Sequence, residues 1–223
     1  MKMTILYDNE KCREDLDADW GFACLVEVQG LKILFDTGAD GPVLLENMNK
    51  LDIDPGTVDE VFISHVHFDH TGGLFDFLNV CSANVYIPSC ISVPEFHGEF
   101  ATIRDPVEIH PDIFSTGELD GFEQSLVVRI KDGLAVIVGC SHPGVEPILK
   151  RASRWGQVKA LLGGFHGFDE FHLLKDLAVI CPAHCTLYKK EIKGAFPAKT
   201  IEGGVGRVIE IEDWDTTPGT GVK

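Results

Sequence analysis

The sequence predicts a mixed α and β fold in which two sheets pack face to face and helices cover their outer sides, an αββα sandwich of four layers. Apolar runs pair as hairpins in the first part of the chain, and strands alternate with helical segments in the second. Periodicity alone predicts only a mixture of α and β, so the layering depends on the motif described below. We expect one domain over residues 1–223, because a chain of 223 residues can bury one sizeable core.

The elements of the first half are marked by breaking residues and by apolar spacing. Gln29 and Gly30 separate two apolar runs, which predicts a hairpin. Pro42 precedes apolar residues at helical spacing, and a helix tolerates proline at its first position. In chain order we expect strands at residues 22–28 and 31–35, a helix at 42–51, a strand at 58–64, a helix at 71–78 and a strand at 85–87.

The second half begins with a segment that is harder to interpret. Residues 88–121 contain four prolines and little periodicity, which predicts a loop with short strands. Asp132 and Gly133 then stand between two apolar runs, a pair typical of a tight hairpin turn. In chain order we expect strands at residues 125–130 and 134–138, a helix at 145–155, a strand at 160–162, a helix at 171–177, and strands at 178–181 and 208–211.

The charge of the chain argues against several kinds of partner. Lys and Arg number 19 against 35 Asp and Glu, a formal net charge of −16. A surface this negative repels phosphate backbones and anionic lipids, so neither nucleic acid nor a membrane is an expected partner. The densest basic group, Lys189, Lys190 and Lys193, is too small to reverse that charge.

The N-terminal residues and the cysteines predict a cytoplasmic protein. The first ten residues contain no long apolar region, and no stretch approaches the roughly 18 apolar residues of a spanning helix. The seven cysteines are widely spaced and include no Cys-x-x-Cys pair. This pattern indicates reduced thiols rather than a disulfide framework.

The strongest chemical signal is the run His-Val-His-Phe-Asp-His at residues 65–70, directly after a predicted strand. His65 and His67 are two apart in extended backbone, so their rings point the same way and can hold one metal. Asp69 and His70 follow as the chain turns and can face a second metal. Imidazole and carboxylate suit zinc, iron or manganese. The alternative interpretation is a solvated polar loop.

Three further histidines follow predicted strands, in loops of small residues: His142, His166 and His184. Binding sites of α/β proteins are built on loops of this kind, so we expect at least two of the three to be ligands. The remaining histidines, His97, His110 and His172, are expected to be ordinary surface or core residues. Asp36 also ends a predicted strand, either as a turn residue or as a carboxylate that orients a ligating histidine.

These motifs resemble the metallo-β-lactamase superfamily. The run at residues 65–70 is preceded by Leu-Phe-Asp-Thr-Gly at residues 34–38, a combination similar to that of the superfamily. A closer resemblance, to the branch with the methanopterin-pathway dihydropterin–aminobenzene phosphate synthases and many metal-dependent hydrolases, is carried by residues 70–74 (His-Thr-Gly-Gly-Leu), 139–144 (Gly-Cys-Ser-His-Pro-Gly), 163–166 (Gly-Gly-Phe-His) and 182–186 (Pro-Ala-His-Cys-Thr). The resemblance spans roughly residues 22–211 and implies the αββα sandwich with one or two metals at its edge.

The resemblance also implies a ligand set: His65, His67, Asp69, His70, His142 and His184. The first two match the ligands of one metal, and the next two match those of a second. Many relatives carry a bridging aspartate in the segment that holds His142, whereas residues 139–144 contain none. His142 is therefore expected to bind one metal only.

The expected function is that of a metal-dependent hydrolase with a small anionic or phosphorylated substrate. One or two zinc ions are the expected cofactor, with iron or manganese as alternatives, and zinc lowers the pKa of a bound water from about 15.7 to about 7. The closer resemblance implies a pterin-related condensation as a variant. Two other classes stay open: a di-iron redox protein on the same fold, and a non-catalytic metal-binding protein. The sequence does not specify an oligomeric state.

We expect Asp69 and His166 to act in catalysis. Asp69 would orient the nucleophile and take part in proton transfer. His166 is expected to contact the substrate, because six ligands already supply three for each metal and leave one zinc position open. We also expect the strands that precede His142 and His184 to be neighbours in one sheet.

Overall fold

The computed structural model describes residues 1–91 and 100–212. Over these residues the strands form one sheet of seven strands and one of six. The first sheet contains β1 (Lys2–Tyr7), β2 (Ala23–Val28), β3 (Leu31–Phe35), β4 (Glu60–Phe62), β5 (Asn84–Pro88), β6 (Phe100–Ile103) and β13 (Val208–Glu210). The second contains β7 (Val107–His110), β8 (Ile113–Ser115), β9 (Leu126–Ile130), β10 (Gly133–Val138), β11 (Val158–Gly164) and β12 (Val179–Ala183).

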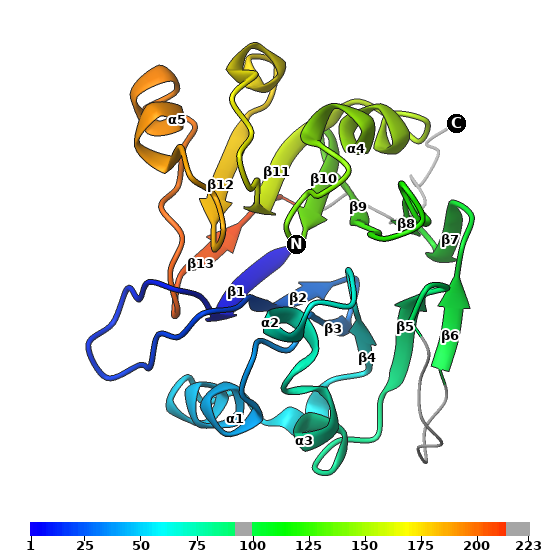
Figure 1. Ribbon diagram of the computed structural model, residues 1–223, viewed down its shortest axis with the longest axis vertical. Coiled ribbons are helices and arrows are strands. Elements are labelled where there is room, and N and C mark those ends of the chain that lie inside the picture. Colours follow the sequence, from blue (N-terminus) through cyan, green and yellow to red (C-terminus); the bar gives the residue numbers. More distant parts are fainter. Residues whose placement is uncertain (92–99, 213–223) are drawn as a thin grey trace, which may run out of the picture.

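The sheets face each other and helices lie on their outer sides, which confirms the predicted αββα sandwich (Figure 1). The spatial order is β13-β1-β2-β3-β4-β5-β6 in the first sheet and β12-β11-β10-β9-β8-β7 in the second. The helical elements are α1 (Gly41–Lys50), α2 (Phe68–Thr71), α3 (Leu74–Leu78), α4 (Val145–Ala152) and α5 (Lys189–Ala195), with 3-10 turns at Pro55–Thr57 and Phe171–Leu174. No helix within the described ranges is long and apolar enough to cross a membrane.

Strand residues alternate between two apolar layers, because successive side chains point to opposite faces of a sheet. In β2, Cys24 and Val26 join the layer between the sheets, and Leu25 joins the layer beneath α1. In β10, Ile137 lies between the sheets and Val136 lies beneath α4. Both faces of these strands are buried, which explains why they occur in the sequence as continuous apolar runs.

Parallel strands bring the segments that carry the motifs to one edge of each sheet. β3, β4 and β5 run parallel in the first sheet, and β10, β11 and β12 run parallel in the second. The carboxyl ends of parallel strands lie at the same edge of a sheet. Gly139, directly after β10, allows the two edges to approach closely, since a Cβ there would lie 2.2 Å from Ser64 Oγ.

Among the elements that the sequence analysis does not predict are β1 and α5. β1 is stabilised by distant partners, such as the pair Met3 and Ile209 across to β13. α5 buries only Ile192, so it has no apolar face for periodicity to detect. The helix predicted at residues 171–177 is a 3-10 turn over Phe171–Leu174.

Candidate metal centre

The six predicted ligands lie together where the carboxyl ends of strands from the two sheets meet. Two follow β4 on the segment that leads into α2, two lie within α2, one follows β10 and one follows β12. They form two groups, which we name the open cluster (His65, His67 and His142) and the closed cluster (Asp69, His70 and His184).

In the open cluster three imidazole rings converge. His65 Nε2 lies 3.2 Å from His67 Nδ1. The ring centroid of His142 lies 4.7 Å from the centroid of each of the other two rings. His65 is fully buried, whereas His67 and His142 reach the surface. The open cluster therefore has a buried floor and an accessible rim.

In the closed cluster a carboxylate faces two buried imidazoles. Asp69 Oδ2 lies 3.2 Å from His184 Nε2 and 3.8 Å from His70 Nε2. His70 is 0% exposed and His184 is 3% exposed. Despite its closeness to the carboxylate, the buried His184 Nε2 makes no hydrogen bond. One ring nitrogen is thus aimed into the cluster without a satisfying protein partner.

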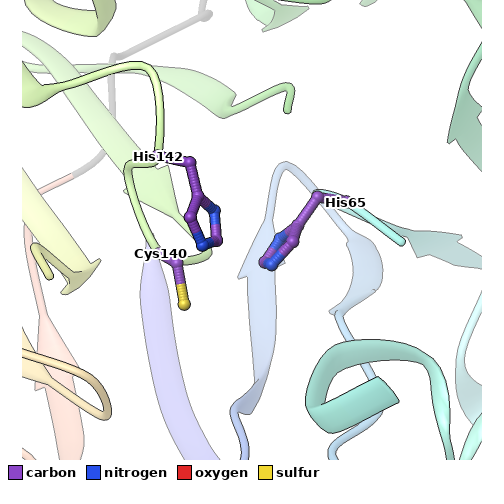
Figure 2. A group of neighbouring side chains, drawn as sticks. All are labelled: His65, Cys140 and His142. Atoms are coloured by element: carbon purple, nitrogen blue, oxygen red, sulfur yellow. The ribbon is translucent and has the colours of Figure 1, made fainter. Parts of the chain in front are cut away.

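Cys140 stands between the clusters. Its Sγ lies 3.2 Å from His70 Nε2, and it could share a metal with His65 and His142 on one side or with His70 and His184 on the other. Figure 2 shows His65 approaching from the segment after β4, and Cys140 and His142 from the segment after β10. The thiol occupies a position from which one ligand could reach a metal in either cluster.

Hydrogen bonds at the outer ring nitrogens orient the imidazoles. Nδ1 of four histidines meets a side-chain oxygen: His65 with Ser64 at 2.8 Å, His70 with Asp36 at 2.7 Å, His142 with Glu123 at 2.8 Å and His184 with Asn9 at 3.0 Å. Metal-binding histidines use one ring nitrogen in this way, which leaves the other free for the metal. Imidazole, carboxylate and thiolate together suit zinc or a related transition metal, so these residues fit a metal centre.

The protonation states of these groups also suit metal binding. Burial, together with the charges of neighbouring histidines, lowers the pKa of His65 to about 2 and that of His70 to about 3. Burial acts to raise the pKa of Glu123, but hydrogen bonds from His142 and from backbone amides lower it to about 2. The pKa of Asp69 is also lowered, because neighbouring imidazoles outweigh its burial. Neutral imidazoles and ionised carboxylates are the forms that bind a metal.

Glu123 holds the turn after β10, which carries Cys140 and His142. Its Oε1 accepts hydrogen bonds from the backbone N–H groups of Cys140 at 3.1 Å and Ser141 at 2.8 Å. Its Oε2 accepts from the backbone N–H of His142 at 2.9 Å and also meets the His142 ring. One buried carboxylate therefore positions the turn that carries both Cys140 and His142.

Among the described residues, four of the eight non-glycine residues with left-handed backbone lie at or beside the centre. Asp36, Ser141, His166 and His184 have φ values of 55°, 60°, 47° and 46°. Residues other than glycine rarely adopt this region. Such residues persist where surrounding contacts hold them, and they cluster at functional sites.

His166 lies beside the clusters and belongs to neither. Its ring centroid is 5.4 Å from that of His142. Both residues line a pocket of about 480 Å³, whose charged lining consists of Glu146, Asp169 and Glu170, with no lysine or arginine among the described residues that line it. The exposed imidazole is placed where a substrate could meet it, and its catalytic role stays a prediction.

One expectation about the sheet is wrong. The strands that precede His142 and His184 are not neighbours, because β11 lies between β10 and β12. It is His166 that follows the intervening strand. The separation places the two imidazoles in different clusters.

Of the other three histidines, the structure describes His110 and His172, and both lie apart from the centre. His110 Nε2 meets Glu60 Oε1 at 2.6 Å. His172 is exposed on a 3-10 turn. Both are ordinary surface or partly buried residues, as expected, and His97 lies outside the described residues.

Sequence reasoning missed three residues of the centre, namely Asn9, Glu123 and Cys140. Asn9 and Glu123 belong to no ligand motif, and only the folded chain brings them to the imidazoles. Cys140 lies two positions before His142 and is not among the predicted ligands, although a thiolate is a common ligand of zinc. Asp36 orients His70, which is the second of the two roles expected for it.

Comparison with known proteins identifies the family of the chain. A family model described as the metallo-beta-lactamase superfamily matches residues 21–161. The chain belongs to the metallo-β-lactamase superfamily. The chain is also similar to a protein from Methanocaldococcus jannaschii. That relative is named 7,8-dihydropterin-6-methyl-4-(beta-D-ribofuranosyl)-aminobenzene-5'-phosphate synthase. It is 30% identical, and the match covers 77% of this chain and 82% of the relative. The resemblance to this branch is thereby confirmed.

Solved structures of metallo-β-lactamase proteins share the fold. The crystal structure of Tm1679, described as a metal-dependent hydrolase of the beta-lactamase superfamily, is 27% identical with a TM-score of 0.76, over 96% of this chain and 100% of that one. The metallo-beta-lactamase fold protein YhfI from Bacillus subtilis is 14% identical with a TM-score of 0.67, over 94% of this chain and 99% of that one. At that identity, YhfI supports the superfamily fold alone.

Proposed function

We propose that the chain is a metal-dependent hydrolase of a small phosphorylated molecule, with one or two zinc ions, or iron or manganese in their place. The proposed ligands are His65, His67, Asp69, His70, His142 and His184. One observation carries the proposal: four imidazoles are held at Nδ1 from outside while ligand-type atoms face one another across the interior. Coordination would satisfy His184 Nε2, which is buried without a hydrogen bond.

The chemistry is divided between the metal and the residues around it. A transition metal bound in such a centre polarises a phosphoryl oxygen and activates water as a nucleophile. The lowered pKa of Asp69 keeps its carboxylate ionised, so Asp69 orients the nucleophile by accepting its hydrogen bond. His166, exposed at the rim of the adjoining pocket, donates a proton to the leaving group.

Apolar side chains around the centre favour a substrate that contains a flat ring. Trp20, Val66, Phe68 and Leu187 are four of the eight large apolar side chains exposed in the described part of the chain. Trp20 packs against His184 with ring centroids 5.2 Å apart. Val66 and Phe68 alternate with the proposed ligands. Leu187 donates its backbone N–H to the backbone carbonyl of His166. An aromatic or heteroaromatic ring packs favourably on such side chains.

A pterin-linked condensation is the second candidate, and the same apolar side chains favour it. The relative from Methanocaldococcus jannaschii is named as a synthase of a dihydropterin joined to an aminobenzene phosphate. Such a condensation would use the same residues with a different nucleophile, the second organic substrate in place of water. Diphosphate would leave from the pterin in that case.

Metal analysis of three proteins tests the ligand set. Wild type should contain about one to two equivalents of transition metal. His67→Ala should lose metal and activity together, whereas His166→Ala should keep its metal and lose about 10²–10⁴-fold in turnover. Full metal loading of His67→Ala would contradict the ligand set. Loss of metal from His166→Ala would make His166 a ligand.

Substrate assays separate the candidate functions. Hydrolysis is measured with bis(p-nitrophenyl) phosphate, and condensation with a dihydropterin diphosphate and an aminobenzene riboside phosphate. Product in the second assay alone would favour the synthase. Bound iron with visible absorption and no activity in either assay would favour the di-iron redox protein. A colourless, metal-loaded protein without activity would favour non-catalytic metal binding.

A further inference from the structure

A second pocket contains none of the residues of the metal centre. It lies between α5, the segment after β1 and the segment before β13, which are on the same side of the molecule (Figure 1). Its volume of about 460 Å³ is in the range of small-molecule sites. The charged residues that line it are Lys11, Lys189, Lys190, Lys193, Arg207, Glu10 and Glu202. Five cations against two carboxylates leave a surplus of three positive charges, in a chain whose net charge is −16.

The two carboxylates pair with two of the lysines. Glu202 forms an ion pair with Lys193. Glu10 Oε1 lies 3.6 Å from Lys189 Nζ, and the Glu10 side chain is largely exposed. Lys189 and Lys193 lie one turn apart on α5, where like charges repel each other. These pairs neutralise part of the pocket and leave the other cations available.

Two of those cations have no carboxylate partner within residues 1–91 and 100–212. Lys190 is exposed and forms no ion pair there. Arg207 donates from Nε to the backbone carbonyl of Glu202 at 2.8 Å, which orients the guanidinium and leaves its terminal N–H groups for another acceptor. An oriented guanidinium and an unpaired ammonium that line one pocket are donors of the kind that recognise phosphate.

The walls of the pocket are held in place by backbone hydrogen bonds. The N–H of Cys12 donates to the carbonyl of Val205 at 2.9 Å, and the N–H of Val205 donates to the carbonyl of Glu10 at 2.8 Å. The buried Asp8 accepts from the N–H of Gly204 at 3.1 Å. The cations therefore project from segments that are already ordered, which lowers the entropic cost of binding a ligand.

We propose that this pocket binds the phosphate or diphosphate group of a small molecule. The surplus of cations selects an anion, and the volume admits a small ligand. The negative surface elsewhere disfavours a nucleic acid. The site goes beyond the proposed function because it needs no metal. It differs from the pocket beside His166, whose charged lining consists of Glu146, Asp169 and Glu170.

Calorimetric titration of the full chain with inorganic pyrophosphate, at low and at high salt, tests the proposal. Lys190→Glu should weaken binding by about tenfold or more, because it replaces a charge-assisted contact with a repulsive one. Lys150→Glu is the matched control, since Lys150 is exposed on α4 outside the pocket and has no ion pair in the described chain. Circular dichroism verifies that both variants fold. High salt should weaken the wild-type interaction.

His67→Ala separates this pocket from the metal centre. Binding that persists in His67→Ala and falls in Lys190→Glu supports the pocket, whatever the outcome of the activity assays. Equal affinities of Lys190→Glu and Lys150→Glu would overturn the proposal. So would binding that disappears only in His67→Ala, which would place pyrophosphate at the metal centre, or a wild type that binds no pyrophosphate at low salt.

Discussion

The open cluster and the closed cluster hold the proposed ligands at different depths. In the closed cluster His70 and His184 are at most 3% exposed. In the open cluster the His142 side chain is 25% exposed and His67 is exposed as well. A metal in the closed cluster would be shielded from water, whereas a metal in the open cluster would be within reach of a substrate. We therefore expect the two clusters, if both hold a metal, to have different tasks.

The carboxylates that orient the imidazoles also differ between the two clusters. The closed cluster depends on Asp36, which is buried and hydrogen-bonded to His70 and Ser64. The open cluster depends on Glu123, which is bonded to His142 and to three backbone N–H groups. Removing the imidazole leaves Asp36 with two hydrogen bonds, both from Ser64, and leaves Glu123 with three hydrogen bonds from backbone N–H groups. The closed cluster should thus be the more important half for stability.

The largest expected effect is on the pH dependence of stability in the metal-free protein. His65 and His70 keep pKa values of about 2 and about 3 in the folded chain, against about 6.5 when unfolded. Below pH 6.5 only the unfolded state takes up these protons, so the free energy of unfolding falls as pH falls. Each histidine contributes about 1.4 kcal/mol per pH unit, or about 5 kcal/mol for both between pH 6.5 and 4.5.

Urea unfolding with a chelator present, measured across that range, checks the pH prediction. His70→Ala should show a shallower slope than wild type, because one of the two groups is gone. A slope that is the same in the variant would show that His70 is not the source. Stability independent of pH would contradict the neutral state of both imidazoles.

The next effect compares one imidazole from each cluster. His70→Ala leaves the buried Asp36 carboxylate with Ser64 as its remaining partner and should lower the free energy of unfolding by about 3 kcal/mol. His142→Ala leaves the three backbone donors of Glu123 in place and should cost about 1 kcal/mol. Urea unfolding of the two metal-free variants measures both. Equal losses would remove the distinction between the clusters.

A smaller effect concerns metal affinity in the open cluster. Glu123→Gln keeps the size of the side chain, but its amide nitrogen cannot accept the hydrogen bonds that the carboxylate oxygen accepts. Affinity for one metal equivalent should fall by about 10–100-fold while the other equivalent is retained. Competition with a chelator measures this. Glu146→Gln is the control, since Glu146 lines the neighbouring pocket and should change neither affinity.

The smallest effect tests whether Cys140 joins the clusters. A hydrogen bond with Cys185, together with burial, raises the pKa of Cys140, so the thiol is protonated before metal binds. Coordination requires the thiolate. Metal addition to wild type should release about one more proton than addition to Cys140→Ala, measured with a pH indicator. Equal release would exclude Cys140 as a ligand, and Cys185→Ala should behave like wild type.

Several features of the fold could be predicted because they depend on neighbouring residues. The hairpin turns at Gln29 and at Asp132 lie between apolar runs that are adjacent in the chain, and both hairpins are present. α1 was predicted from Pro42 and the apolar spacing that follows it. β1 could not be predicted in this way, because its partners β2 and β13 are assembled from opposite ends of the chain.

The residues of the metal centre likewise divide into those that local sequence reveals and those that only the fold brings together. The run at residues 65–70 was recognisable because four ligand-type residues fall within six positions of the chain, and this short segment supplies side chains to both clusters. His142 and His184 were found because each follows an apolar strand. Asn9 and Glu123 could not be found, because a carboxamide and a carboxylate in irregular segments carry no local sign of the imidazoles that they orient.

The sequence by itself determined the superfamily, the mixed fold and the residues that can bind a metal, because periodicity, turn residues and motif spacing are local properties of the chain. Only the tertiary structure decided how those residues are grouped. β11 separates β10 from β12, and His142 and His184 therefore enter different clusters with Cys140 between them. The two sheets meet at one edge through contacts between distant segments, and those contacts also decide which histidines are buried and which imidazole each polar group orients.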